Sequence, residues 1–346
     1  EYKLGDLFSI HNTLSFNTDK LVTGSKYDYI TRTSQNQGIL QQTGFVNKEN
    51  INSAGNWSLG LLQMDFFYRN NEWYAGQFVR KIVPKIHISK NSISFFTSVL
   101  NKQKTKLLSV LVRDVDKTFL NYIIKLPTKN NKIDFDFIES FNLKLESEHI
   151  SELKTYLLNN NLEDYNLTSI EKQVLADFEN NKIEFGSFTY KSIFNNIKQG
   201  RRLTKDDQKS GNIPFVMAGV TNTGVVNYIS NPVATFPKNS ITVDIFGNTF
   251  YRNYDYGAGD DTGAYWNSKV EYSKELMLFF TTAMEKSIFG KFDYGNKLRS
   301  SQSFDFTMQL PIFNKKPDFE TMETFISAIL KLVIKDVVLY VNKKLE

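Results

Sequence analysis

Four polar side chains lie close together near the start of the chain, namely Arg32, Thr33, Gln35 and Gln37. Arginine makes paired hydrogen bonds with the edge of guanine, and glutamine makes them with the edge of adenine. Such side chains bind and discriminate bases, but they supply no nucleophile. The cluster is therefore a candidate for base contact, and a merely solvated loop is the alternative.

The residues that support nucleophilic or metal chemistry are scarce. The chain has no Cys, which excludes a disulfide, a Cys-ligated zinc site and a thiol nucleophile. Its three His are far apart in the sequence, at positions 11, 87 and 149. Residues 231–232 are Asn-Pro, but Val233 follows them, so the Asn/Asp-Pro-Pro-Phe/Tyr motif of amino-methyltransferases is absent. We expect no catalytic residue, no metal site and no cofactor in this chain.

Basic side chains recur in both halves of the sequence. The stretch 66–90 holds five Lys or Arg and one Glu, interleaved with aromatic residues, a composition suited to phosphate contact. The net charge of +5 permits a nucleic-acid partner without requiring one. Solvated loops are the alternative for most of these residues, and an internal ion pair is the alternative for the arginines at 69 and 252. The further candidate DNA contacts are Arg69, Tyr74, Gln77, Arg80, Lys81, Lys198, Arg201, Arg202, Arg252, Arg299 and Gln302.

The elements that must position these residues come from two copies of one unit. The tetrapeptide Phe-Tyr-Arg-Asn occupies 67–70 and again 250–253. Leu-Pro at 126–127 and Asp-Phe at 134–135 both recur 184 positions later. A shared offset over this length indicates an internal duplication. Residues that differ between the copies are the ones suited to reading different bases, and the four polar residues of the first cluster face Ala218, Gly219, Thr221 and Thr223.

Each copy combines a globule with a long helix. Short β-branched and aromatic runs alternate with Asn and Gly turns, which predicts a mixed α+β fold. Segments free of Gly and Pro follow, at 134–161 and 318–345, and both predict helices. Apolar residues on them recur at coiled-coil spacing, which favours pairing of the two helices over packing of each on its own globule. These residues are Ile138, Phe141, Leu145, Leu153, Leu157, Met322, Ile326, Ile329 and Val333.

A further helix is predicted to begin at Thr168, where Glu171 completes a capping box, and to bridge the two halves. With 346 residues, the chain is long enough for two domains. No apolar run reaches the roughly 20 residues of a membrane span, and the chain opens without a signal-sequence pattern, so we expect a cytoplasmic protein. The predicted organisation is a globule at 1–133, a spacer helix and the bridging helix at 134–185, a second globule at 186–317 and a second spacer helix at 318–346.

The sequence resembles the DNA sequence-specificity (S) subunits of Type I restriction–modification systems and their shorter Type IIB relatives of the BcgI kind. The resemblance covers the whole chain, including its duplication, although the second copy lacks the Arg-Asp pair. It rests on Leu-Gly-Asp-Leu-Phe at 4–8, Tyr-Ile-Thr-Arg-Thr at 29–33, Asn-Gln-Gly at 36–38, Phe-Tyr at 67–68, Tyr-Ala-Gly-Gln-Phe at 74–78, Arg-Asp at 113–114, and the Leu-Pro step with the helix after it.

The resemblance implies that each globule is a target recognition domain, and that the long helices form an antiparallel coiled-coil spacer between the two. It implies a noncatalytic subunit that reads a bipartite, asymmetric site in double-stranded DNA and positions adenine methyltransferase and nuclease subunits there. Those partners would bind S-adenosylmethionine and magnesium. Two other functions stay open: a stand-alone nuclease of duplicated domains, and a protein scaffold that does not bind DNA.

Overall fold

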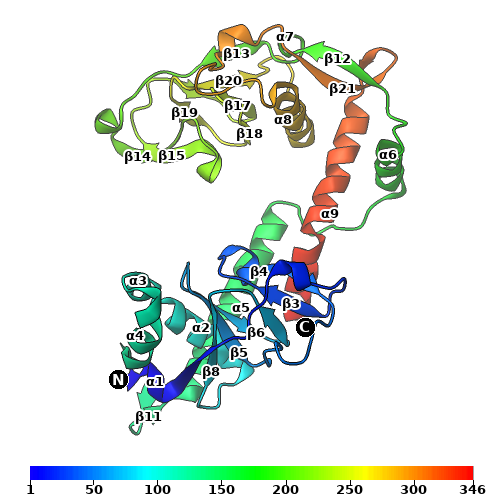
Figure 1. The fold of residues 1–346 in the computed structure, drawn as a ribbon. Helices are drawn as coiled ribbons and strands as arrows, with labels where there is room; N and C mark the ends of the chain where they lie inside the picture. Colours follow the sequence, from blue (N-terminus) through cyan, green and yellow to red (C-terminus); the bar gives the residue numbers. More distant parts are fainter. Residues whose placement is uncertain (346) are drawn as a thin grey trace. The chain divides into compact units, whose positions relative to one another are not determined.

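The computed structural model describes residues 1–345. Contacts divide the chain into two compact units, Glu1–Leu153 and Lys154–Glu346. Each unit mixes helices with small sheets, as the alternation of strand-like runs and turns predicts (Figure 1). Within residues 1–345, no helix is both long enough and apolar enough to cross a membrane.

The first unit contains a larger antiparallel sheet and a smaller mixed sheet. The larger sheet has the strand order β2 (Phe8–Asn12), β8 (Val79–Pro84), β5 (Asn56–Gly60) and β6 (Asp65–Arg69). In the smaller sheet the central strand β3 (Tyr27–Ile30) lies antiparallel to β4 (Ile39–Thr43) and parallel to β7 (Trp73–Ala75). The parallel register pairs Tyr29 with Tyr74, so the chain after β3 and the chain after β7 leave the sheet side by side.

Short helices and strand pairs complete this unit. The helices are α1 (Leu4–Leu7), α2 (Ile93–Asn101), α3 (Lys104–Leu108) and α4 (Val115–Asn121). The strand pairs are β1 (Tyr2–Lys3) with β9 (Ile123–Ile124) and β10 (Thr128–Lys129) with β11 (Lys132–Ile133).

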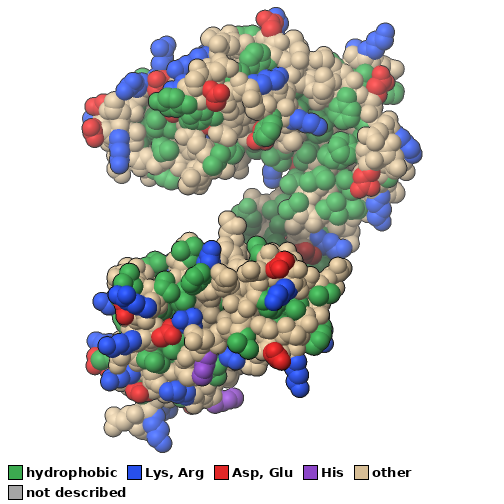
Figure 2. Space-filling model, viewed as in Figure 1, with side chains coloured by type: hydrophobic (Ala, Val, Ile, Leu, Met, Phe, Trp, Pro, Cys, Tyr) green, Lys and Arg blue, Asp and Glu red, His purple; other side chains and the backbone are tan. Residues whose placement is uncertain are grey.

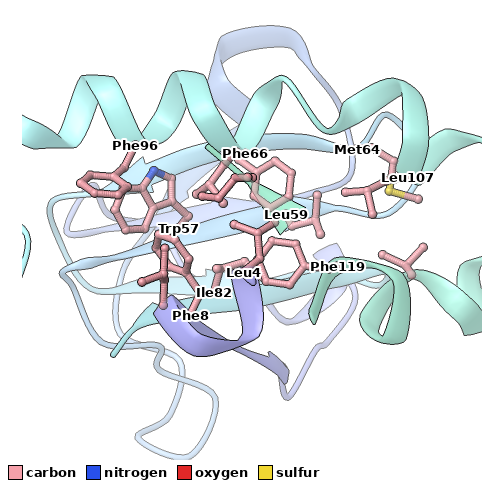
Figure 3. Close-up of a cluster of buried hydrophobic side chains, with 14 of the residues drawn as sticks. Leu4, Phe8, Trp57, Leu59, Met64, Phe66, Ile82, Phe96, Leu107 and Phe119 are labelled. Carbon is pink, nitrogen blue, oxygen red and sulfur yellow. The ribbon is translucent and has the colours of Figure 1, made fainter. Parts of the chain in front are cut away.

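The core of the first unit lies between the larger sheet and the helices. Figure 3 shows Trp57 and Phe66 from the strands and Phe96 from α2 pointing toward one another. Phe8 meets Trp57 edge to face, with ring centroids 5.8 Å apart. The indole Nε1 of Trp57 donates to Thr97 Oγ1 at 2.8 Å, so the one polar atom of this ring is satisfied. This core joins the larger sheet to the helices of the first unit.

The second unit repeats this architecture. Its larger sheet has the order β13 (Asn196–Gln199), β20 (Thr262–Trp266), β17 (Ser240–Asp244) and β18 (Thr249–Arg252). In the smaller sheet β14 (Ser210–Val216) lies antiparallel to β15 (Val225–Ile229) and parallel to β19 (Tyr256–Ala258), which also pairs with β16 (Thr235–Phe236). The remaining elements are α7 (Tyr190–Ile193), α8 (Lys274–Ile288), β12 (Phe185–Thr189), β21 (Thr307–Phe313) and β22 (Lys316–Pro317).

The two units differ after the helix that covers the larger sheet. In the first unit α3 and α4 follow, with the exposed Arg113 and Asp114 between them. In the second unit α8 lies against the sheet of β17 and β18 (Figure 1), and a non-helical segment at 289–299 follows it. This difference occurs where the second copy lacks the Arg-Asp pair.

The two long helices form where Gly and Pro are absent, as α5 (Phe135–Asn159) and α9 (Phe319–Leu345). Both begin with an aspartate cap, since Asp134 Oδ1 accepts from the N–H of Phe137 at 3.0 Å and Asp318 Oδ1 accepts from that of Thr321 at 3.1 Å. Each helix is also tied to its own unit by one serine–glutamate hydrogen bond. The pairs are Ser89 with Glu139 at 2.6 Å and Ser273 with Glu323 at 2.5 Å.

Two of the predicted helix-pairing residues pack elsewhere. Ile138 and Met322 are fully buried in the hydrophobic cores of the first and second units, respectively. The reason is that each long helix starts directly after a strand pair of its unit, so its first turn faces that unit. For these two positions the prediction of helix pairing was wrong, and packing on the own globule is correct.

Helix α6 (Ser169–Glu179) begins at the predicted capping box. The Glu171 N–H donates to Thr168 Oγ1 at 3.2 Å, and the Thr168 N–H donates to Glu171 Oε2 at 2.7 Å. Glu171 also accepts from Ser327 at 2.7 Å and from Lys331 at 3.1 Å, both on α9. Helix α6 therefore packs on α9 within the second unit.

Candidate DNA-recognition surfaces

The loop between β3 and β4, residues 31–38, carries the four polar residues of the first cluster. Arg32, Gln35 and Gln37 are exposed, and Thr33 is half-buried. The loop is closed by a hydrogen bond from the N–H of residue 31 to the carbonyl of residue 38, at 2.8 Å. Two consecutive non-glycine residues in it, 36 and 37, have φ of 44° and 53°. Such left-handed residues are uncommon, so this backbone needs support from its surroundings.

Arg69 supplies that support from beneath the loop. It is 4% exposed at the end of β6, and its Nη2 donates to the carbonyl of Gln37 at 2.5 Å. Its Nε donates to Ser58 Oγ at 2.9 Å. Burial lowers the pKa of Arg69 to about 10, against an opposing effect of Asp28, so the guanidinium stays charged at neutral pH. Hydrogen bonds from a charged donor are stronger than neutral ones, which suits Arg69 to hold the loop.

The loop between β14 and β15, residues 217–224, has the same frame. The N–H of residue 217 donates to the carbonyl of residue 224 at 2.9 Å, and residues 222 and 223 have φ of 47° and 52°. Arg252 is 1% exposed, and its Nη2 donates to the carbonyl of Thr223 at 2.6 Å. Its Nε donates to Thr242 Oγ1 at 3.0 Å. The alternative of an internal ion pair for Arg69 and Arg252 is thus replaced by hydrogen bonds to a carbonyl and a hydroxyl.

Beside the first loop the surface is hollowed into a cleft of about 660 Å³, whose lining includes Arg32, Thr33 and Gln77. The Arg32 guanidinium lies over the ring of Phe78, 5.3 Å from its centroid. Phe78 is 52% exposed and has φ of 61°, an uncommon conformation for a bulky residue and one that tends to occur at functional sites. A guanidinium stacked on an aromatic ring keeps its N–H edge for a ligand.

Gly60 permits this arrangement, because a Cβ at that position would lie 2.9 Å from Arg32 Cα. The role of Phe78 was missed in the sequence analysis, since nothing in its residue type indicates a left-handed backbone. The support from Ser58 was also missed, although a hydroxyl recurs at Thr242, 184 positions later, and signals it.

The equivalent surface of the second unit has different chemistry. The sheet registers align Gly60 with Asp244, because Gly60 pairs with Val79 and Asp244 pairs with Thr262. By the same alignment two aspartates, at 260 and 261, stand where the first unit has Gln77 and Phe78. Carboxylates accept hydrogen bonds from cytosine amino groups, whereas arginine side chains donate to guanine.

Two arginines of the second unit bond to backbone carbonyls at or near these aspartates. Arg299 Nη1 donates to the carbonyl of Asp260 at 2.5 Å, and the N–H of Arg201 donates to the carbonyl of Ala258 at 3.0 Å. Arg201, Arg202 and Arg299 are all exposed. This surface therefore combines donors and acceptors, as the reading of base edges requires.

Other candidate residues make contacts inside their own unit. Tyr74 is fully buried and its hydroxyl donates to the carbonyl of Asn47 at 2.8 Å. Arg80 pairs with Asp116 at 3.1 Å, and Lys81 is half-buried on β8. Burial in the sheets keeps Tyr74, like Arg69 and Arg252, from direct contact with DNA, which corrects their selection as contact residues.

The remaining candidates are exposed. Gln77 Nε2 donates to Asn17 Oδ1 at 3.3 Å, and the Lys198 ammonium lies 5.6 Å from the Trp266 ring centroid. Gln302 Oε1 accepts from the N–H of Arg299 at 2.7 Å and thereby orders that segment. Figure 2 shows Lys and Arg side chains spread among neutral ones over the visible face of each unit. Residues 1–345 contain no group of three His, Cys, Asp or Glu placed to hold a metal ion.

Comparisons with known proteins cover both halves of the chain. The family model of the Type I restriction modification DNA specificity domain matches residues 1–155 and again residues 182–339. The chain is 25% identical over 274 residues to the "Type II restriction enzyme BgcI specificity subunit S.BcgI" of Heyndrickxia coagulans, covering 78% of this chain and 75% of that protein. The crystal structure of the Type I restriction-modification S subunit from M. genitalium has a TM-score of 0.58 at 15% identity, covering 99% of this chain and 91% of the other. The chain therefore belongs to the Type I restriction modification DNA specificity domain family, carries this domain twice, and is a specificity subunit rather than a catalytic one.

Proposed function

We propose that this chain reads a bipartite, asymmetric site in double-stranded DNA and positions adenine methyltransferase and nuclease subunits on it. The observation that carries the proposal is that the two units share one backbone scaffold but carry different side chains around it. Both units hold a loop of the same backbone shape on a buried arginine. The residues around the loops differ, with the exposed Arg32 and Phe78 in one unit and the half-buried Asp260 and Asp261 in the other. A shared scaffold with different side chains is suited to docking two half-sites in the same way while reading different bases.

The residues divide into two roles under this proposal. Base edges are read by Arg32, Gln35, Gln37 and Gln77 in the first unit, and by the loop at 217–224 with Arg201, Arg202 and Arg299 in the second. Phosphates are contacted by basic side chains of the larger sheets, among them Lys81 on β8 and Lys198 on β13. Phosphate contacts fix position without carrying sequence information, whereas base contacts specify.

The long helices set the distance between the half-sites. The matched serine–glutamate bonds support this role, because each fixes a recognition unit to its own helix in the same way. We propose that α5 and α9 pair as an antiparallel coiled coil and that partner subunits dock on these helices. Exposed apolar side chains on them, such as Phe141 at 47% and Val333 at 72%, leave surface for such contacts. S-adenosylmethionine and magnesium belong to the partner subunits.

The test compares the purified chain alone with the chain assembled with a methyltransferase subunit. We expect the assembly to methylate adenine at one split sequence in the presence of S-adenosylmethionine, and its DNA affinity to fall with salt as phosphate contacts require. DNA cleavage by the chain alone with magnesium would instead support the nuclease alternative. Methylation and DNA affinity that do not depend on the chain would support the scaffold alternative.

A further inference from the structure

The two loops share a backbone although their sequences differ. Of the eight aligned positions, only Asn36 with Asn222 and Gly38 with Gly224 are identical. Both asparagines are left-handed, and the side-chain amide of each donates to the carbonyl three residues later, at 3.3 Å in both loops. The shape is therefore set by these two positions and by the residues beneath the loop.

The supporting residues recur in both units as well. Each buried arginine donates through Nη2 to the carbonyl of the second left-handed residue and through Nε to a hydroxyl on the neighbouring strand. The hydroxyl group of Ser58 and that of Thr242 each donate in turn to a strand carbonyl at 3.4 Å. Each guanidinium also lies over a Phe ring, at 5.7 Å for Phe67 and 5.4 Å for Phe250. Two copies that have diverged elsewhere keep this support complete.

In both units the arginine binds the loop backbone, and in the second unit Arg252 Nη1 also donates to Thr223 Oγ1 at 3.1 Å. The carbonyl that each arginine binds belongs to Gln37 in one unit and Thr223 in the other, whose side chains are exposed. A carbonyl is present whatever the side chain, so the Nη2 hydrogen bond that the two units share does not depend on the residue type at these positions. The planar guanidinium reaches the hydroxyl and the carbonyl together, which the single ammonium of lysine does not reproduce.

We propose that Arg69 and Arg252 are positioning residues that hold an interchangeable recognition loop, so that base preference follows the side chains at positions 32, 33, 35 and 37 in the first unit and 218, 219, 221 and 223 in the second. The inference rests on the proposed function and deepens it. Within each loop it assigns specificity to four positions, and it assigns the shared loop geometry to the buried arginine.

The first experiment exchanges the loop chemistry while keeping the support. The variant R32A/T33G/Q35T/Q37T carries in the first unit the residues found in the second, and Asn36, Gly38 and Arg69 are unchanged. Its methylation motif is compared with that of the wild-type chain, both assembled with the same methyltransferase. We expect the half-site of the first unit to change toward the bases that the second unit reads, and the other half-site to stay. An unchanged first half-site overturns the proposal.

The second experiment weakens the support while keeping the loop. For Arg69→Lys we expect discrimination within the first half-site to fall by about tenfold, giving a degenerate motif there and an intact second half-site. Arg113→Lys is the matched control, because Arg113 is an exposed arginine outside the loop and its support, and it should keep the motif. A purely structural arginine would change the melting temperature and the total methylation but not the bases read. An unchanged motif with Arg69→Lys overturns the positioning role, and if this variant does not fold, the loop exchange decides.

Failure of this inference and failure of the proposed function are distinguishable. If the proposed function fails, the wild-type chain itself directs no split motif. If only the inference fails, the wild-type motif is present and the loop exchange leaves it unaltered.

Discussion

At the scale of single residues, the structure separates the exposed side chains around the loop from the buried side chains that support the loop backbone. Arg32 lies on an exposed ring beside a cleft, whereas Arg69, of the same type, is buried and bound to the protein. Residue type alone does not distinguish these roles. The internal repeat does, because Arg69 recurs as Arg252 while Arg32 is replaced by Ala218.

Arg32→Ala should relax recognition at one half-site only. Loss of a paired hydrogen bond to a base costs about 1–3 kcal/mol of discrimination. The measurement is the affinity of the assembled complex for cognate DNA and for DNA altered in one half-site. Lys81→Ala is the comparison: as a phosphate contact, its loss should weaken binding equally on all sequences and reduce the salt slope by about 1. Equal weakening by Arg32→Ala on every sequence would show that Arg32 reads no base.

The sequence predicts part of this site and not the rest. Comparing the two copies selected the loop at 31–38, because aligned residues that differ are candidates for specificity. The same comparison did not place Arg69 beneath that loop, since its contact with Gln37 depends on how two sheets meet. The exposed, left-handed Phe78 was out of reach as well, because tertiary contacts and not residue type impose its backbone.

At the scale of elements, local signals predicted helix starts well. The Thr168–Glu171 capping box begins α6, and segments free of Gly and Pro became α5 and α9. Periodicity assigned the apolar faces less well, because it does not tell which neighbour a face meets. For example, Ile138 packs in the core of the first unit. In addition, the capping residue Glu171 of α6 accepts a hydrogen bond from Ser327 on α9.

The contact between Glu171 and Lys331 should stabilise the second unit at neutral pH. Burial acts to raise the pKa of Glu171, but hydrogen bonds from Thr168, Ser327 and Lys331 together lower it below its usual value of 4.5. A carboxylate whose folded pKa is lowered stabilises the fold above its unfolded pKa and loses this contribution as pH falls through the folded value. Lys331→Met removes this contact and also the ion pair that Lys331 makes with Asp164 at 2.9 Å, and should therefore cost about 1 kcal/mol at pH 7.

The measurement that checks this stability loss is thermal unfolding of the wild-type and Lys331→Met chains, at pH 7 and at successively lower pH. The difference between them should shrink once the pH falls below 4.5. Lys335→Met removes an exposed charge one turn further along α9 and serves as the control. A difference that persists undiminished in acid would show that the lysine contributes by packing and not through the carboxylate.

At the scale of the whole molecule, duplication is the organising feature. Two units with one scaffold, each tied to its own long helix, fit a protein that reads two half-sites. The duplication was visible in the sequence because the tetrapeptide at 67–70 and the Leu-Pro step repeat. The number of positions between equivalent residues of the two copies changes by a few along the chain, since the intervening loops differ in length.

Lengthening α5 should change the number of bases between the two half-sites and leave the bases read within each half-site unchanged. Inserting four residues near Glu148 lengthens the helix by about 6 Å, at 1.5 Å per residue. We expect the methylated motif to keep both half-sites and to gain spacer bases. A substitution of the exposed Glu148 by Gln without insertion is the control. A motif with altered half-sites and an unchanged gap would show that the helix does not set the spacing.

The central claim is that this chain supplies the sequence specificity of a modification complex. It is tested most directly by sequencing methylated bases in cells that express a partner methyltransferase with and without this chain. The account predicts an asymmetric, split adenine-methylation motif that appears only when the chain is present. The same motif without the chain would contradict it, as would no motif from a methyltransferase that is active with another specificity subunit.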